Sequence, residues 1–474
     1  MSAKGVSFEF DGFELSRNLG KIYFYYTLKL NDNKVYNFTE TLILPDPLPD
    51  FSLVPKPTLD EILKSVHLIL GISYWKTYCP KEIKLKKLKL SKEQAHFWNV
   101  VYTKGLGEFF YENQIDFHDL VTFPFSEHES LPLELNLSEK ILLPFGGGKD
   151  SIVSGELLKK STKSLTAFVL GKNTPIQESG VKTLGIPTLQ VQRRLDPKLM
   201  ELNQLNGVYN GHIPISAIYH FVSLLVGVLC GYRYIAFSNE ASSNFGNVTY
   251  LGETINHQWS KSFEFETLFR NYVKTYLVKN IEIFSFLRPL YEIKIAQVFV
   301  DFPEYFKSFS SCNTNFKIQS HGLPNYAKAT LGTLRRDGSA TRSSLKASEV
   351  WCGKCPKCAF VFAILSAFIP KKELVDIFGK NLFNETSLVT TYKQLLGMTE
   401  IKPFDCVGTP EESQVAFYMT HQKGDYDTDA IMKMFVAELL PNITNSLESE
   451  KVKVFLPQKE HHVPAEFLTL LENH

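Results

Sequence analysis

Three consecutive glycines between an apolar stretch and a helical pattern constrain the fold of this chain more than any other feature. Residues 141–145 have the length and composition of a buried strand, and residues 151–160 follow a helical pattern. The glycines between them, Gly146, Gly147 and Gly148, let the backbone approach a bound group closely and aim several N–H groups at it. Because the N-terminus of the following helix adds a partial positive charge, the segment is typical of a phosphate-binding turn. The alternative is a glycine-rich turn that binds no ligand.

The glycine turn belongs to a longer alternation of strands and helices. Further apolar strands are expected at residues 165–170, 187–191 and 232–237, with a helix at residues 213–230. Such spacing predicts βαβ units around a parallel sheet, and therefore an α/β fold. Ligands of these sheets bind beyond the carboxyl ends of the strands, so we expect the segments that follow the strands to form the walls of a site.

Three parts are expected along the chain. Residues 1–130 combine period-2 strand patterns with two helical patterns, which predicts a smaller N-terminal α+β domain, and we assign it a role in substrate binding. Residues 137–370 would hold the parallel sheet, and residues 371–474 would form a mostly helical C-terminal region. Residues 313–350 are rich in Ser, Thr, Gly, Lys and Arg, which predicts a long mobile insertion.

Composition and charge argue against several classes of protein. The chain is 44% hydrophobic and 21% charged, as an ordinary globular protein is, and its formal net charge of +1 gives no reason to expect a nucleic acid as partner. The longest apolar run, residues 221–230, is about half the length of a membrane span and fits a buried helix. The first residues contain no apolar signal-peptide core, so we expect a cytoplasmic protein that does not bind membranes.

Three polar residues follow the glycines. Lys149 is expected to neutralise phosphate charge, Asp150 to hold Mg²⁺ shared with the phosphates, and Ser151 to donate to a phosphate oxygen or to cap the helix. The loop is not a Walker A motif, because it lacks the four-residue gap before Gly-Lys. It resembles the PP-loop, usually Ser-Gly-Gly-x-Asp-Ser, of enzymes that split ATP into AMP and pyrophosphate, with Gly146 in place of the first serine. This resemblance implies a Rossmann-like, HUP-type domain that binds ATP and Mg²⁺.

Four of the seven cysteines form a second motif. Cys352, Cys355 and Cys358 are separated by two-residue gaps, and Cys312 lies upstream. Two such gaps place three thiolates around one tetrahedral zinc ion, and Cys312 would supply the fourth ligand. Such a site is structural, because four thiolates leave no open position for a substrate. The alternative is a set of reactive or buried thiols.

Polar groups gather in residues 238–244 and 256–266, directly after an expected strand and a little further along the chain. The candidates for proton transfer in these segments are Glu240, His257, Lys261 and Glu264. Among them His257 has an ordinary pKa closest to neutrality, which favours it as a general base. The alternative for each of these charges is a solvated helix face.

The order of these motifs is more specific than any one of them. Along the chain they occupy residues 144–151, 238–240, 256–266, 311–313, 351–358 and 406–412. Over about residues 140–420 this order resembles the UDP-N-acetylmuramoyl-L-alanyl-L-glutamate epimerases of peptidoglycan synthesis. Arg288 and Lys294 lie in an element that resembles one found late in PP-loop domains, which implies contacts with the nucleotide phosphates.

The resemblance implies a reaction in which the terminal L-Glu of a UDP-sugar dipeptide becomes D-Glu while ATP is converted to AMP and pyrophosphate. Adenylation turns the α-carboxylate into a neutral mixed anhydride, so its charge no longer opposes removal of the Cα proton. His257 is then the expected base, with a carboxylate from Glu240 or Glu264 near it. Cys312 is a thiol base only if it does not bind the metal.

Two other functions remain open at this point. Another PP-loop enzyme that adenylates a carboxylate, such as a ligase or amidotransferase, would need a nitrogen donor, and the N-terminus has no glutaminase-like cysteine. A zinc-bearing nucleic-acid-binding or tRNA-modifying protein would carry a basic domain with interleaved aromatic residues, against which the balanced charge argues.

Overall fold

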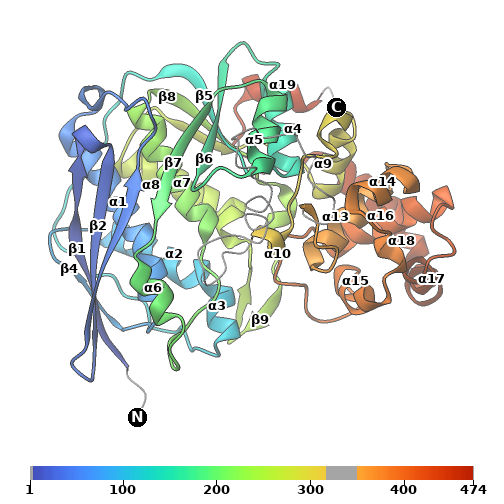
Figure 1. The fold of residues 1–474 in the computed structure, drawn as a ribbon, viewed down its shortest axis with the longest axis horizontal. Helices are drawn as coiled ribbons and strands as arrows, with labels where there is room; N and C mark the ends of the chain where they lie inside the picture. The colour runs from blue at the N-terminus through green and yellow to red at the C-terminus, as the bar shows by residue number, and fades with distance from the viewer. Residues whose placement is uncertain (1–3, 317–349, 473–474) are drawn as a thin grey trace, which may run out of the picture.

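The computed structural model describes residues 4–316 and 350–472 of the 474-residue chain. Residues 317–349, most of the insertion predicted at 313–350, lie outside the described residues. The N-terminal strands and the C-terminal helices lie at opposite ends of the molecule, with the glycine turn between them (Figure 1).

Within the described residues, the main sheet has nine strands in the order β11-β8-β5-β6-β7-β3-β2-β1-β4. Their bounds are β1 Gly5–Ser16, β2 Lys21–Leu30, β3 Val35–Ile43, β4 Glu82–Leu85, β5 Ser138–Pro144, β6 Ser164–Leu170, β7 Thr188–Arg194, β8 Tyr232–Phe237 and β11 Glu282–Ser285. The strands from β11 to β7 all pair in parallel, which confirms the predicted parallel sheet. A separate hairpin joins β9 (Val248–Tyr250) to β10 (Glu253–Ile255).

Two hydrophobic cores lie on the two faces of the parallel strands. Ile141 and Leu143 of β5 belong to one core and Leu142 to the other, because successive side chains of a strand point to opposite faces. The first core includes α4 (Lys149–Leu158), α5 (Pro175–Leu184) and α9 (Glu292–Phe299). The second includes α1 (Lys56–Trp75), α7 (Ile215–Leu229) and α8 (Phe263–Tyr276). Burial on both faces explains why β5 reads as a continuous apolar run.

The chain reverses its direction across the sheet at β5. β6 and β7 follow on one side of β5, whereas β8 and β11 lie on the other side. The carboxyl ends of β5 and β8 therefore flank a topological switch point, where sheets of this kind leave a crevice for a ligand.

The N-terminal part forms an antiparallel meander of β1, β2 and β3, with β4 parallel to β1 at the sheet edge. Buried and partly exposed residues alternate along the whole of β2, which confirms the period-2 prediction. The two predicted helical patterns correspond to α1 and to the pair α2 (Lys92–Gly105) and α3 (Gly107–Glu112). The sheet is continuous across the boundary predicted between residues 130 and 137, and the division into three parts stays a prediction.

A buried ion pair closes the junction between the meander and the parallel strands. β3 pairs with β7 through Thr41, Leu42 and Ile43. Beside this pairing, Arg193 Nε lies 2.6 Å from the carboxylate of Glu40, which is completely buried. The Arg193 guanidinium also donates to Ser73 Oγ at 3.0 Å. Arg193 thus connects both strands to α1.

The C-terminal part is helical, as predicted. Its helices are α13 Pro356–Ser366, α14 Lys371–Phe378, α15 Val389–Leu395, α16 Pro410–Lys423, α17 Ala430–Met434, α18 Leu440–Phe455 and α19 Ala465–Glu472. Two short helices, α6 (Pro197–Leu202) and α10 (Asn313–Phe316), lie in the preceding part of the chain. Across residues 4–316 and 350–472, no helix has both the length and the apolar character that a membrane crossing requires.

We predict that Glu40→Ala lowers the free energy of unfolding by about 3 kcal/mol, because it leaves the Arg193 guanidinium buried without a counter-charge. Urea denaturation followed by circular dichroism measures the change. Asp60→Ala, which removes an exposed pair with Lys56, is the matched control and should change stability little. Equal effects of the two substitutions would show that the junction does not depend on this pair.

Candidate active site

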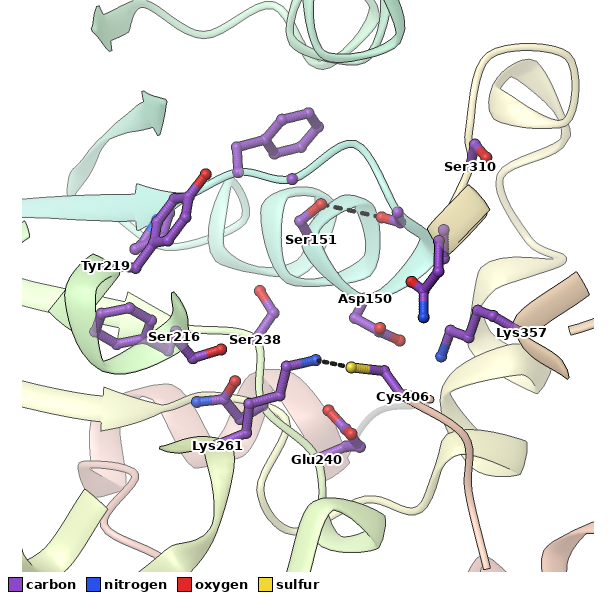
Figure 2. A pocket seen from close by; sticks show the side chains of 18 residues that line it. Asp150, Ser151, Ser216, Tyr219, Ser238, Glu240, Lys261, Ser310, Lys357 and Cys406 are labelled. Atoms are coloured by element: carbon purple, nitrogen blue, oxygen red, sulfur yellow. Dashed lines mark hydrogen bonds between the residues drawn. The ribbon is translucent and has the colours of Figure 1, made fainter. Parts of the chain in front are cut away.

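A cavity of about 340 Å³ lies at the switch point (Figure 2). Its walls come from the segments after β5 and β8, from the start of α4 and from residues 310–313. The other lining residues are Ser216, Tyr219, Lys261, Lys357 and Cys406. Two of the four segments that were expected to form walls therefore meet here, while the segments after β6 and β7 do not line the cavity.

The glycine turn has a conformation that its sequence explains. Gly147 has a φ of 81°, which side chains of L-residues rarely tolerate. A Cβ on Gly148 would lie 2.9 Å from Ser311 Oγ, whereas a Cβ on Gly146 would meet nothing within 4 Å. Ser151 Oγ accepts from the N–H of Gly147 at 3.1 Å and donates to the carbonyl of Gly148 at 3.0 Å. Ser151 thus shapes the turn around the open space at Gly146.

Lys149 does not line the cavity, unlike the two polar residues that follow it in the chain. Asp150 and Ser151 line the cavity, but Lys149 is completely buried and pairs with the carboxylates of Asp150 and Glu292. Glu292 also pairs with Lys357, whose Nζ lies 3.0 Å away. Burial alone would raise the pKa of Glu292, but Lys149 and Lys357 hold it well below its usual range. Of the two lysines that pair with Glu292, Lys357 is the one that lines the cavity.

Glu240 is a buried acid on the cavity wall. It follows β8 directly after Asn239, whose amide donates to Ser285 Oγ at 3.0 Å and so fixes the segment to β11. Burial raises the pKa of Glu240 to about 7, with Lys261 lowering it and the nearby carboxylates raising it. The group is therefore able to give or accept a proton near neutral pH.

Cys406 also lines the cavity and is surrounded by basic groups. Its Sγ lies 3.4 Å from Lys261 Nζ and 3.8 Å from His257 Nε2. Through Nδ1, His257 bonds to the carboxylate of Glu108, and His212 Nδ1 bonds to the same carboxylate oxygen at 3.0 Å. His257 does not line the cavity, so it contacts Cys406 and Glu108 behind the wall.

Besides Gly147, Lys149, His257 and Cys312, three further residues predicted for the site lie outside the cavity lining. Arg288 is buried and donates to the carbonyl oxygens of Glu240 and Lys261, so it holds the two loops together. Lys294 donates to Gln297 Oε1 at 2.8 Å on α9. Glu264 pairs with Lys104 at 2.5 Å and lines a different cavity.

Sequence reasoning gave no site role to Lys357, Cys406, Glu108 or Glu292. Lys357 lies between Cys355 and Cys358, and the spacing of these cysteines indicates a metal site but assigns no role to the residue between them. Cys406 belongs to the motif at 406–412, but its partners His257 and Lys261 are 149 and 145 residues away in the chain. No local pattern indicates such a contact.

The four cysteines of the second motif come together. The sulfur atoms of Cys312, Cys352, Cys355 and Cys358 all lie within 4.8 Å of one another. Sγ atoms are 3.7 Å apart for Cys352 and Cys358 and 4.0 Å apart for Cys312 and Cys355, near the roughly 3.8 Å edge of a tetrahedron with 2.3 Å zinc–sulfur bonds. All four thiols are free of disulfides, and backbone N–H groups donate to three of the sulfurs, as they do to thiolates. The donor set fits a structural zinc ion, and Cys312 lies with the other three.

Two family models and three curated proteins match the chain. Residues 1–286 match the family model described as the MurL N-terminal domain, and residues 340–450 match the MurL C-terminal domain. Three curated proteins named UDP-N-acetyl-alpha-D-muramoyl-L-alanyl-L-glutamate epimerase are similar to the chain. The protein of Xanthomonas oryzae pv. oryzae is 34% identical over 86% of this chain and 84% of its own length. The Micromonospora protein is 32% identical over 98% of this chain and 97% of its own length. The Salinispora tropica protein is 34% identical over 89% of this chain and 86% of its own length.

We predict that the purified protein carries one zinc ion per chain, measured by elemental analysis under non-chelating conditions. Cys352→Ser should lower the zinc content and the melting temperature together, because the metal holds α13 to the segment at Cys312. Cys230→Ser, outside the cluster, is the control. A zinc content well below one equivalent in the wild type would contradict the assignment.

Proposed function

This chain belongs to the MurL family, and we propose that it epimerises the terminal L-glutamate of UDP-N-acetylmuramoyl-L-alanyl-L-glutamate to D-glutamate in peptidoglycan synthesis. We further propose that the reaction consumes ATP through an acyl-adenylate and releases AMP and pyrophosphate. The observation that carries the proposal is the glycine turn at the switch point, with Asp150 and Glu240 lining one cavity from two different segments.

ATP is proposed to bind with its phosphates at the glycine turn, in the manner of the PP-loop class. The turn opens the cavity beside Gly146, and the N-terminus of α4 points its N–H groups there. Asp150 would hold Mg²⁺, which neutralises phosphate charge when bound. The sequence assigned the phosphate lysine to Lys149, and we now assign that role to Lys357, because Lys149 is buried outside the cavity lining whereas Lys357 lines the cavity.

The chemical logic of adenylation explains why such a site suits an epimerase. A Cα proton beside a free carboxylate is hardly acidic, because its removal places a second negative charge beside the first. Attack of the α-carboxylate on the α-phosphate of ATP expels pyrophosphate and gives a neutral mixed anhydride. The Cα–H bond then breaks with its electron pair moving to the acyl oxygen as an enolate. A proton returned to the opposite face gives the D-glutamyl adenylate, and water releases AMP.

Two residues after β8 are proposed to contact the reacting acyl group. Lys261 is an ammonium on the cavity wall, because its Cys406 and Glu240 neighbours raise its pKa against the effect of burial. It is placed to balance negative charge that develops on the acyl group. Glu240, with a pKa of about 7, is the proposed acid that returns a proton to Cα.

The nucleotide-sugar part of the substrate is proposed to occupy a second cavity of about 890 Å³. Lys104 and Phe117 of the N-terminal part line it together with Asn256 and Trp259, from the turn that also carries His257 and Lys261. Polar and aromatic side chains of this kind suit a sugar and a base. This placement gives residues 1–130 the substrate-binding role that their sequence position suggested.

The other functions considered from sequence receive less support. A ligase or amidotransferase and a tRNA-modifying protein of the PP-loop class would share the ATP chemistry. However, the three relatives, which this chain matches over 84% or more of their own lengths, are all named as epimerases. The deciding experiment incubates the protein with ATP, Mg²⁺ and UDP-N-acetylmuramoyl-L-alanyl-L-glutamate and then analyses the glutamate on a chiral column. D-glutamate with stoichiometric AMP supports the proposal. Unchanged L-glutamate would contradict it.

We predict that Asp150→Ala lowers pyrophosphate release by at least about a hundredfold, because the cavity loses its Mg²⁺ ligand beside the glycine turn. A coupled phosphate assay measures the rate at saturating ATP. Asp60→Ala, an exposed carboxylate on α1, should retain the wild-type rate. A folded Asp150→Ala protein that releases pyrophosphate normally would remove the PP-loop assignment.

A further inference from the structure

Cys406 is a thiol in the reaction cavity that the proposed function has not used. It lines the same cavity as Asp150 and Glu240, and Figure 2 shows its sulfur directed toward the Lys261 ammonium. Lys357 lines the same cavity. The backbone of the neighbouring Val407 accepts a hydrogen bond from Gln258, which ties this loop to the turn at His257 and Lys261.

A relay of polar groups stands behind the sulfur. Nε2 of His257 faces Cys406, while its Nδ1 bonds to Glu108. A carboxylate on one ring nitrogen favours the protonated imidazole, and the second ring nitrogen then presents its proton to the sulfur. Burial would lower the pKa of His257, but its bonds to Cys406 and Glu108 raise it to about 10. The imidazole is thus a cation at neutral pH and cannot itself accept a proton there.

The charges around the sulfur favour its thiolate form. Burial alone would raise the pKa of Cys406, but the Lys261 ammonium and the His257 bond lower it to about 6. Lys357 and Lys402 add positive charge, whereas Glu240 adds negative charge only when ionised. The remaining cysteines differ, since burial raises the pKa of Cys79 and Cys230 and the other four form the metal cluster.

We propose that the Cys406 thiolate is the base that removes the Cα proton of the glutamyl adenylate, and this inference rests on the proposed function. The Cα–H bond breaks, an S–H bond forms, and the electron pair passes to the acyl oxygen as an enolate. The Glu240 carboxylic acid then gives its proton to the other face of Cα, and the electron pair returns from oxygen to carbon. Proton exchange with solvent restores the thiolate and the carboxylic acid after product leaves.

His257 and Glu108 are positioning residues in this scheme. They lie behind Cys406 and do not line the cavity, so they act on substrate only through the sulfur. The sequence analysis assigned the role of base to His257, and we now assign that role to Cys406, the residue that His257 contacts at the cavity. The thiol role considered for Cys312 is not needed, because that sulfur lies in the four-cysteine cluster.

The first test measures thiolate character by alkylation. Iodoacetamide at pH 7 should modify Cys406 before Cys79 and Cys230 in the zinc-bound full chain, as peptide mass spectrometry shows. His257→Ala should slow modification of Cys406 at least about tenfold, and ATP with the UDP-dipeptide should protect it. Modification of Cys230 at the same or a higher rate than Cys406 would overturn the thiolate assignment.

The closing test separates proton transfer from adenylation. In heavy water, Cys406→Ser and Cys406→Ala should incorporate deuterium at the glutamate Cα about 10²- to 10⁴-fold more slowly than the wild type, while pyrophosphate–ATP exchange with the UDP-dipeptide stays within a few-fold. Cys230→Ser is the matched control and should keep both activities. Deuterium incorporation at the wild-type rate in the Cys406 variants would overturn the inference, as would loss of both activities in a folded variant. A wild type that shows neither activity would instead be a failure of the proposed function.

Discussion

One buried carboxylate, Glu292, holds the two functional halves of the molecule together. It is the first residue of α9 and pairs with Lys149 at the start of α4 and Lys357 near the start of α13. Glu292 thus joins residues from the first turns of three helices, and at its own place at the start of α9 the helix dipole favours an acid. Without Glu292, the buried Lys357 ammonium would lose its carboxylate partner and Lys149 would keep only Asp150, at a cost of several kcal/mol. The glycine turn and the cysteine cluster are therefore linked by the same ion-pair network.

The elements that sequence analysis predicted are those whose information is local. β5, the glycine turn and α4 follow one another within residues 138–158, and the apolar run and the three glycines in this segment predict them directly. The cysteine cluster was predicted for the same reason, since two-residue gaps determine the geometry of three ligands. The placement of Cys312 across the insertion came from counting ligands, and the structure confirms that it lies with the other three.

The features that sequence analysis missed depend on register and on contacts between distant segments. Lys149 and Lys357 look equally suited to bind phosphate, and only the packing of α4 against α9 decides that Lys149 turns inward to Glu292. The pairing of β3 with β7 joins two units that were expected to be separate into one sheet. No sequence pattern in either strand predicts this pairing. The partners of Cys406 lie 145 or more residues away, so its surroundings emerge only from the folded chain.

The distance between the two cavities bears on the length of substrate that the protein can accept. Because β3 is hydrogen-bonded to β7 and the pair Glu40–Arg193 is buried beside it, the N-terminal meander and the parallel strands form one continuous sheet. The turn at residues 256–262 contributes side chains to both cavities, so their separation is fixed by covalent geometry over a few residues. This separation sets the length of a ligand that can reach both cavities. If the substrate occupies both cavities as proposed, the length of the peptide between its sugar and its glutamate would decide whether it fits, and a chain one amino acid shorter or longer would place the wrong carbon at the Cys406 sulfur.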